Sequence, residues 1–370
     1  MNFSMYMPVD VRSGKDCVKN NADCFTVGTR AMLVTGRHAA KICGALDDVI
    51  EVLDSVGIPY TVYDQIGENP LMSVCYRGGK EAAAFGADMI IGIGGGSAMD
   101  AAKAIAAYAA NPRIQAEEIF TQKRNPSYPL ILIPTTAGTG SEVNPYAVLT
   151  LDGQDKKKTF TDKTQSYAKY AFLDAKYTML LSEKNTVSCA LDAFAHCAES
   201  YLSPKADETS RMFAGYGARI LYAFLRNFVP GQQLSYETRE TLLYASSAAG
   251  IAINKTGTGF PHPLGYNLTL TKGIPHGCAC AVFYREYLDY NEKAAPLLCR
   301  ALYDEIGAAG EEIKALIPKR AGVCLTLDED TICTYVEKVK GAGNYKNSPY
   351  VINEKEMADI YRRLFGTQNA

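Results

Sequence analysis

The chain has 370 residues, of which 47% are hydrophobic and 21% are charged, and its formal net charge is -2. This length favours two domains, because a single hydrophobic core rarely grows beyond about 300 residues. The nearly balanced charge provides no basic footprint for nucleic acid or for an anionic membrane, so we expect neither as a partner.

The cysteines and the N-terminus indicate the compartment. Eleven cysteines occur without a Cys-x-x-Cys pair, and an odd number of thiols in apolar helical patterns is typical of a reducing environment. No signal-peptide pattern opens the chain, and no uncharged apolar run reaches the roughly 18 residues that span a bilayer. We therefore expect a cytoplasmic protein. Cys278 and Cys280 are expected to be small buried helix residues rather than metal ligands.

The first half of the chain alternates between short apolar runs and helical patterns. A short strand or hairpin is expected near the N-terminus, over Phe3–Val11. Buried strands and helices are then predicted in turn at Ala31–Thr35, Ala39–Val56, Pro59–Tyr63, Pro70–Phe85, Asp88–Ile93, Ala98–Ala110 and Leu130–Ile133. This alternation predicts a mostly parallel, Rossmann-like sheet with helices on both faces.

From about Ser182 onward, helical patterns dominate. They cover Asn185–Leu202, Asp207–Phe228, Tyr236–Ile253, His276–Asn291 and Ala294–Ile306, with shorter ones up to Leu364. The basic run Lys156–Lys158 and the segment Tyr266–Ile274 are expected to be loops. We predict an α/β nucleotide-binding domain over residues 1–178 and an all-α domain over residues 179–370.

Two loops that follow predicted strands have the composition of a nucleotide site. Gly94, Gly95, Gly96 and Ser97 open a helix, where free amides and the helix dipole favour a phosphate. Asp100 and Lys103 follow on its first turns, and Lys103 could reach a phosphate or order the site. The second loop runs from Pro134 to Glu142 and offers the hydroxyls of Thr135, Thr136, Thr139 and Ser141. Each loop alone is also compatible with an ordinary tight turn.

The end of the first strand bears on the choice of nucleotide. Ligands of parallel sheets bind at the carboxyl ends of the strands, so both loops and Gly36 should converge at one edge. An acidic residue near the ribose favours NAD, whereas Gly36 and Arg37 leave room and charge for the 2′-phosphate of NADP. We therefore expect NADP(H) in preference to NAD(H), with His38 as a surface residue at a helix start.

Three of the four histidines and one aspartate form a candidate metal site. Asp192 and His196 are four residues apart in a predicted helix, so both side chains project from one face. His262 lies between two prolines, and His276 between Pro275 and Gly277, which indicates rigid turns that fix both side chains. One carboxylate and three imidazoles suit a divalent transition metal better than a polar pair satisfied in the core.

Together these motifs resemble the iron-containing (group III) alcohol dehydrogenase family. The similar segments are Gly94–Lys103, Pro134–Glu142, Asp192–Glu199, His262–Gly265 and Pro275–Gly277, which span both halves of the chain in order. The resemblance implies a nucleotide-binding α/β domain and an all-helical domain, the architecture of dehydroquinate synthase-like proteins, with the site in the cleft between them. It also implies a metal held by Asp192, His196, His262 and His276.

One departure from the family concerns a second histidine. Family members often carry two histidines four residues apart before the Pro-His-Gly turn, a ligand and one near the nicotinamide, whereas Thr258 stands four residues before His262. His262 lies fourteen residues before His276, which is the ligand spacing, so we assign it to the metal. The proton path then lacks its usual histidine, and Thr258, a water or the cofactor ribose could replace it.

The resemblance implies NAD(P)-linked hydride transfer between a small alcohol or aldehyde and the nicotinamide, with the metal polarising the substrate oxygen. It also implies Fe(II), with Zn(II) as the alternative, a homodimer, and a role for Lys158 near the cofactor. Alternatives on the same fold are a glycerol- or polyol-type dehydrogenase, a phosphonate- or phosphate-aldehyde reductase, and a non-catalytic metal- or nucleotide-binding relative.

Overall fold

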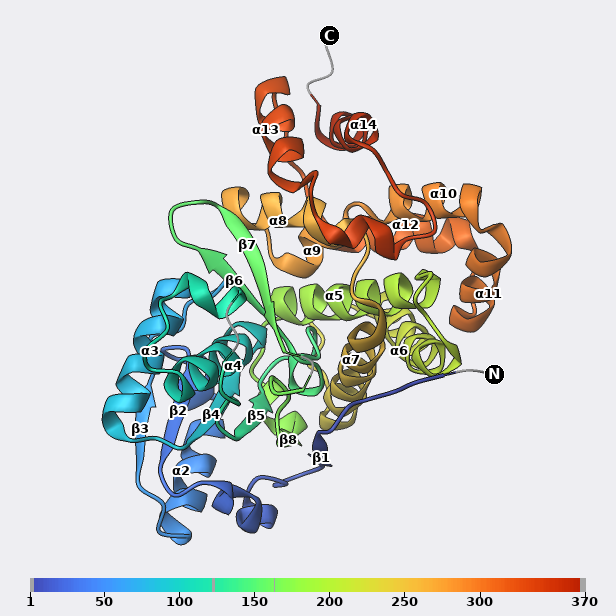
Figure 1. Ribbon diagram of the computed structural model, residues 1–370. Coiled ribbons are helices and arrows are strands. Elements are labelled where there is room, and N and C mark those ends of the chain that lie inside the picture. Colours follow the sequence, from blue (N-terminus) through green and yellow to red (C-terminus); the bar gives the residue numbers. More distant parts are fainter. Residues whose placement is uncertain (1–2, 122–123, 163, 367–370) are drawn as a thin grey trace. The chain divides into compact units, whose positions relative to one another are not determined.

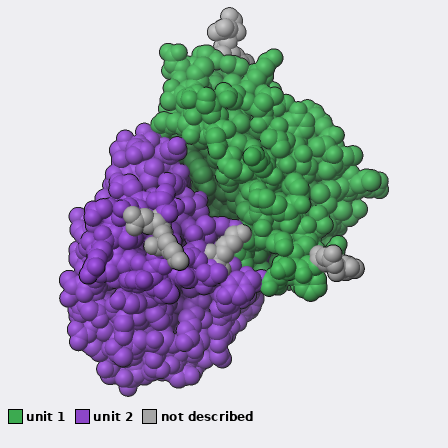
Figure 2. All heavy atoms as spheres, in the orientation of Figure 1, with its two compact units in different colours: residues 1–5, 183–232, 251–370 green, residues 6–182, 233–250 purple. Residues whose placement is uncertain are grey.

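The computed structural model describes residues 3–121, 124–162 and 164–366. Contacts between Cα atoms divide the chain into two compact units, which Figure 2 shows in different colours. The sheet unit consists of residues 6–182 and 233–250, and the helical unit consists mainly of residues 183–232 and 251–370. Each unit is described separately below.

The sheet unit is built on six parallel strands. They are β1 (Asp10–Ser13), β2 (Ala31–Thr35), β3 (Tyr60–Tyr63), β4 (Met89–Gly94), β5 (Leu130–Pro134) and β8 (Tyr170–Leu173), in the order β1-β8-β5-β4-β2-β3. The connecting helices are α1 (Ala39–Ile42), α2 (Ala45–Ser55), α3 (Met72–Phe85) and α4 (Gly96–Ala110). Helices α2, α3 and α4 are labelled in Figure 1. The predicted parallel α/β sheet is therefore confirmed. Because strand order reverses direction between β2 and β4, their carboxyl ends form the switch point where such sheets bind ligands.

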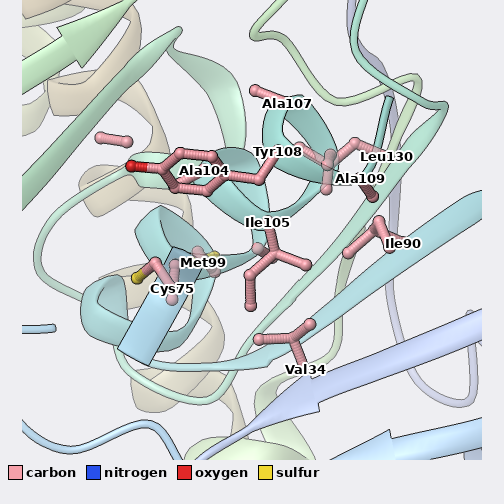
Figure 3. Close-up of a cluster of buried hydrophobic side chains, with 14 of the residues drawn as sticks. Val34, Cys75, Ile90, Met99, Ala104, Ile105, Ala107, Tyr108, Ala109 and Leu130 are labelled. Atoms are coloured by element: carbon pink, nitrogen blue, oxygen red, sulfur yellow. The ribbon is translucent and has the colours of Figure 1, made fainter. Parts of the chain in front are cut away.

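Successive side chains of each strand point to opposite faces of the sheet, so a hydrophobic core forms on each face. Met32 and Val34 of β2 pack in the core that includes residues of α3 and α4, and Leu33 packs in the core that includes residues of α2. Figure 3 shows part of the first core, where Ile105 of α4 lies near Val34 and Ile90. These two buried layers hold the strand ends and their loops in fixed positions.

Several predicted elements differ from the observed ones. The helix expected over Ala39–Val56 is broken into α1 and α2 at Gly44, whose φ of 80° lies in the left-handed region. The first strand is β1, which starts only at Asp10. Lys156–Lys158 lies not in a loop but in β7 (Lys156–Thr161), which pairs antiparallel with β6 (Tyr146–Leu151). With three consecutive lysines, β7 lacks the alternation of apolar and polar residues that would have indicated a strand.

The helical unit contains helices and no strand among the residues that the structure describes. Its helices are α5 (Glu183–Leu202), α6 (Glu208–Asn227), the end of α7 (Tyr236–Thr256), α8 (Pro261–Lys272), α9 (His276–Ala281), α10 (Tyr284–Ala294), α11 (Pro296–Ile306), α12 (Gly310–Ala321), α13 (Glu329–Val339) and α14 (Glu354–Phe365). Among the described residues, 3-10 helices also occur at Lys19–Val27, Glu117–Phe120, Ser141–Val143, Ala175–Thr178 and Gly343–Asn347. No described helix combines the length and the apolar character needed to cross a membrane.

The segment before His276 was expected to be a loop but forms helix α8. Pro261 occupies the first helical position, where a proline costs no hydrogen bond, and His262 lies in the first turn rather than in a separate rigid turn. The helix ends at Gly273, whose φ is 65°. Two prolines and a polar face concealed the helical pattern. The single helix expected over His276–Asn291 is likewise divided into α9 and α10.

Helix α7 connects the two units in sequence, and its first part belongs to the sheet unit. Gly250 of α7 contacts Gly140 so closely that a Cβ on Gly140 would come within 2.5 Å of the Gly250 Cα. Ser247 donates a hydrogen bond of 2.6 Å to the buried carboxylate of Glu142. These contacts tie α7 to the loop that follows β5. The expected domain boundary at residues 178 and 179 stays a prediction.

Candidate functional site

Helix α5 provides one wall of the candidate metal site. Asp192 and His196 are both buried, with exposed fractions of 3% and 6%, and the His196 Nε2 lies 3.8 Å from the Asp192 Oδ1. The apolar, alanine-rich middle of this helix is buried over residues 190–200, so the two polar side chains meet within the helical unit. Their four-residue spacing has the expected effect, because it places both groups on the same face.

Helix α9 brings His276 to the same point. Gly277 is essential to this approach, because a Cβ at that position would come to 1.8 Å from the Ser188 carbonyl oxygen of α5. The helices therefore touch backbone to backbone, and the His276 Nε2 lies 3.7 Å from the Asp192 Oδ1. His276 is the first residue of α9, as predicted for a ligand at a helix N-terminus.

Helix α8 supplies the third imidazole. Gly265 of α8 packs against α9, since a Cβ there would lie 2.7 Å from the Ala279 carbonyl oxygen. The His262 Nε2 consequently lies 3.7 Å from the Asp192 Oδ1, and the His262 ring stacks on the His196 ring with a centroid distance of 4.8 Å. The structure therefore gathers all four of the metal ligands expected from the sequence within one unit.

The geometry of these four side chains fits a divalent cation. Three Nε2 atoms surround the Asp192 Oδ1 at 3.7–3.8 Å, beyond hydrogen-bond distance. Ligands of a tetrahedral ion with bonds of about 2.1 Å are separated by about 3.4 Å, close to these values. The Asp192 Oδ1 and the His262 Nε2 are buried and have no hydrogen-bond partner among the described residues, which is costly unless a cation binds both.

Glu199 orients His262 from behind. Its Oε2 lies 2.8 Å from the His262 Nδ1 and accepts a 2.5 Å hydrogen bond from the Gly259 amide. A carboxylate on Nδ1 fixes the imidazole so that Nε2 faces the site, as is usual for histidine ligands. Glu199 is fully buried one turn after His196 on α5. Glu199 ends the segment Asp192–Glu199 that resembles the family, and its spacing from Asp192, two helical turns, was the available signal that it lies on the same face.

The charges around the site favour a positive centre. Burial raises the pKa of Asp192, but the adjacent histidines outweigh this and hold the pKa well below its usual range. Burial opposes the charged form of His262, yet Glu199 and Asp192 raise its pKa to about 9. Both shifts indicate that positive charge is stabilised here, and a metal ion supplies such charge.

A cysteine that the sequence analysis set aside also lies at this point. Cys280 is buried in α9, one turn after His276, and its Sγ lies 3.8 Å from both ring nitrogens of His276. Ligand atoms of Asp192, His262, His276 and Cys280 all lie within 4.8 Å of one another. The four-residue spacing from His276 was the available signal in the sequence.

In the sheet unit, the two predicted nucleotide loops touch each other. A Cβ on Gly95 would lie 3.1 Å from the Thr136 Oγ1, and a Cβ on Gly96 would lie 2.5 Å from the Thr139 Cγ2. The Thr135 amide donates a 2.9 Å hydrogen bond to the Gly94 carbonyl oxygen. Since α4 begins at Gly96, its first amides and the threonine loop lie together at the carboxyl edge of the sheet.

Three of the residues predicted to bind the nucleotide hydrogen-bond to one another and to the backbone, so their polar groups do not point freely toward a ligand. The Lys103 Nζ donates hydrogen bonds of 2.7 Å to the Ser141 Oγ and to the Tyr146 carbonyl oxygen. The Ser141 Oγ in turn donates to Asp100, which also accepts from the Val148 amide. Burial, opposed by Asp100, lowers the pKa of Lys103 to about 8. Of the two roles considered for Lys103, these contacts match the ordering of the site.

The remaining predicted residues lie at separate places. Gly36 follows β2, and Arg37 and His38 beside it are exposed. Lys158 is exposed on β7, with its Nζ 4.3 Å from the centre of the Phe120 ring. In the helical unit, the Thr258 Oγ1 accepts a 2.7 Å hydrogen bond from the Asn344 side chain. These assignments to the cofactor and to the proton path stay predictions.

Models of two families match the chain in succession. The model for iron-containing alcohol dehydrogenase matches residues 8–175, and the model for the C-terminal region of the iron-containing alcohol dehydrogenase family matches residues 186–318. These matches cover both units.

Individual proteins agree with the family models. A sulfoacetaldehyde reductase of Bilophila wadsworthia is 35% identical over 69% of this chain and 66% of its own length, just under two thirds. An NADPH-dependent butanol dehydrogenase of Clostridium saccharobutylicum is 26% identical over 97% of this chain and 92% of its own. The crystal structure of an iron-containing alcohol dehydrogenase from Thermotoga maritima superposes with a TM-score of 0.90 at 32% identity, covering 98% of this chain and 99% of that one.

Proposed function

The chain belongs to the iron-containing alcohol dehydrogenase family, and we propose that it interconverts small aldehydes and alcohols with a nicotinamide cofactor. The observation that carries this proposal is the buried Asp192 Oδ1, faced by three imidazole nitrogens at 3.7–3.8 Å. A non-catalytic binding protein has no need for four converging ligands and a nucleotide loop pair together. The reaction is therefore hydride transfer between a substrate carbon and the nicotinamide.

Asp192, His196, His262 and His276 would hold the metal ion, and Glu199 would keep His262 in position. When bound, the ion acts as a Lewis acid that polarises the substrate oxygen. The proposed ion is Fe(II), in line with the family, and Zn(II) is the alternative, since a His3Asp donor set binds both. The neutral imidazoles and the single carboxylate leave net positive charge to stabilise a developing alkoxide.

The proposed cofactor is NADP(H) rather than NAD(H), bound by the switch-point loops of the sheet unit. The backbone of Gly95, Gly96 and Ser97 would contact the pyrophosphate at the start of α4. Further contacts are proposed for Gly36, Thr135, Thr136, Thr139 and Lys158, with Asp100, Lys103 and Ser141 holding the loops in place. Exposed Arg37 beside Gly36 provides the charge for a 2′-phosphate, and the similar butanol dehydrogenase is named as NADPH-dependent.

Thr258 is our candidate for the proton path, where many family members carry a histidine. Its hydroxyl accepts a hydrogen bond from Asn344, which leaves the hydroxyl proton available for transfer. Such a relay would pass a proton between solvent and the alcohol oxygen, and removal of a positioned proton donor typically costs about 100-fold in rate.

Two substrate classes follow from the comparisons. Uncharged short-chain aldehydes are the first, in keeping with the family. Aldehydes that carry a sulfonate or phosphonate group are the second, favoured by the 35% identity with a sulfoacetaldehyde reductase.

We further propose a cytoplasmic homodimer, with the functional domains at residues 1–178 and 179–370. The eleven cysteines all lie within the described residues and form no disulfide there, which agrees with a reducing compartment.

A substrate panel tests this function. Protein loaded with Fe(II) or Zn(II) is mixed with NADPH or NADH and with butyraldehyde, lactaldehyde or sulfoacetaldehyde, and nicotinamide absorbance is followed. We expect turnover that depends on the metal and favours NADPH, and Arg37→Ala should raise KM for NADPH alone. Lys41→Ala, an exposed cation on α1, is the matched control. Metal-loaded, folded protein that oxidises neither cofactor with any aldehyde would contradict the proposal.

A further inference from the structure

Cys280 stands where its sulfur can contribute to the metal site. The side chain is fully buried in α9 and follows His276 by one helical turn. Its Sγ lies 3.8 Å from both the Nδ1 and the Nε2 of His276. A sulfur and a nitrogen bound to one tetrahedral zinc ion, at about 2.3 and 2.1 Å, are separated by about 3.6 Å. The distance to the Nε2 is close to this value, and the equal distance to the Nδ1 shows that the sulfur also lies beside the His276 ring.

Independent evidence shows that the space beside Cys280 is suited to a cation. The Asp192 Oδ1 and the His262 Nε2 belong to the same set of ligand atoms within 4.8 Å, and their side chains are 3% and 2% exposed. Neither atom has a hydrogen-bond partner among the described residues. These two buried polar atoms and the sulfur therefore lie close enough together to bind one ion, which would satisfy both of them.

Cys278 provides the contrast. It lies on the same helix and is also buried, but it is outside the set of converging ligand atoms. Because residues two positions apart on a helix face different directions, only one of the two cysteines reaches the metal ligands. The two cysteines therefore differ in the direction in which their side chains leave the helix, so a substitution of Cys278 is a matched control for one of Cys280.

We propose that Cys280 is a further metal donor and that it biases the site toward Zn(II) over Fe(II). A thiolate is a soft ligand that zinc binds well, whereas three imidazoles and a carboxylate do not discriminate between the two ions. On binding, a metal–sulfur bond forms and the thiol proton leaves to solvent. This inference rests on the metal site of the proposed function and answers which ion that site retains.

Cobalt substitution and X-ray absorption test the proposal without reference to turnover. Co(II)-loaded protein should show the intense near-ultraviolet charge-transfer band of a cobalt–thiolate bond, and Cys280→Ser should abolish it while Cys278→Ser retains it. Zinc-edge absorption of the unaltered protein should show a sulfur neighbour at about 2.3 Å, which requires no variant. Competition between Zn(II) and Fe(II) should shift toward iron by about 10-fold in Cys280→Ser.

The outcomes separate this inference from the proposed function. If neither Co(II) nor Zn(II) binds the folded protein, the metal site itself is refuted. If both ions bind with nitrogen and oxygen neighbours only, and Cys280→Ser leaves the zinc-to-iron preference unchanged, the metal site stands and the role of Cys280 is refuted. A charge-transfer band that persists in Cys280→Ser but disappears in Cys278→Ser would assign the sulfur to the wrong cysteine and overturn the proposal.

Discussion

Asp192 is the residue on which the metal site depends. The Nε2 atoms of three histidines, which come from three helices, lie 3.7–3.8 Å from its buried Oδ1. A buried carboxylate without its cation would be costly, so Asp192 and the ion stabilise each other. Glu199 then acts on the site through His262, which makes it a positioning residue.

The substitution Glu199→Gln should weaken metal binding by about 10- to 100-fold, because the carboxylate no longer fixes the Nδ1 side of His262. The Kd is measured by competition with a chromophoric chelator. Ser200→Ala is the control, since this buried neighbour on α5 is hydrogen-bonded to Thr256 rather than to His262. Unchanged metal affinity in Glu199→Gln would show that the hydrogen bond has no orienting role.

At the proposed proton path, Thr258→Val should lower kcat by about 100-fold without loss of metal, because the hydroxyl proton is removed. Thr258→Ser keeps the hydroxyl and should retain most of the activity. Steady-state rates and metal analysis of both variants decide the point. Equal rates for the valine and serine variants would remove Thr258 from the mechanism.

At the scale of elements, close backbone contacts assemble both candidate sites. Gly277 and Gly265 let α5, α8 and α9 approach within the helical unit, and Gly96 lets the two nucleotide loops touch within the sheet unit. Hydrogen bonds at strand starts fix the sheet that holds those loops. Asp88, just before β4, accepts from the Thr29 amide and hydroxyl and from the Arg30 amide, which leads into β2.

Replacing Gly96 with alanine should weaken NADPH binding by about 10-fold, because the new Cβ would push Thr139 away and separate the loops. Nucleotide fluorescence titration measures the change, and metal content should stay constant. Gly67→Ala is the control, since a Cβ there meets nothing within 4 Å. An equal effect in both variants would mean that the contact between the loops is irrelevant to binding.

The carboxylate of Asp88 should make the free energy of unfolding depend on pH. Burial raises its pKa, but the hydrogen bonds from Thr29 and Arg30 outweigh this, so the folded pKa lies below the usual value of an aspartate. The stabilisation is therefore present above the unfolded pKa and is lost as the pH falls through the lower folded pKa. Asp88→Asn should reduce the free energy of unfolding by about 1 kcal/mol at pH 7, because solvent screens these exposed hydrogen bonds.

Urea unfolding of both proteins between pH 7 and pH 3 checks this. The difference between them should shrink as the pH falls below the unfolded pKa. Asp54→Asn, an exposed carboxylate on α2, should show no comparable loss at pH 7. A difference that persists unchanged at the lowest pH would contradict the assignment to the charge of Asp88.

The predicted strands β2 and β4 and the predicted parallel sheet follow from short apolar runs next to glycine-rich turns, which are local signals. The pairing of Asp192 with His196 is also local, because it depends on one helical period. By contrast, α8 was hidden by Pro261 and Pro263, and the β6–β7 hairpin by its lysines. The proximity of Cys280 to Asp192 depends on the contact between α5 and α9, a tertiary fact that spacing does not reveal.

At the scale of the whole molecule, the two units carry different parts of the chemistry. The helical unit contains the residues proposed to bind the metal, and the sheet unit contains the loops proposed to bind the nucleotide. Because the chain belongs to the iron-containing alcohol dehydrogenase family, we infer that the metal site and the nucleotide loops serve the same reaction. We therefore expect turnover to require a metal ion bound by Asp192, His196, His262 and His276.

The most direct measurement is the metal content of the purified protein, taken together with its NAD(P)H-dependent aldehyde reduction. The unaltered protein should retain one divalent ion per chain and reduce an aldehyde of the panel. The Asp192→Ala and His276→Ala variants, shown to be folded by circular dichroism, should lose both the ion and the activity. If either variant keeps the metal content and the rate of the unaltered protein, the central claim is contradicted.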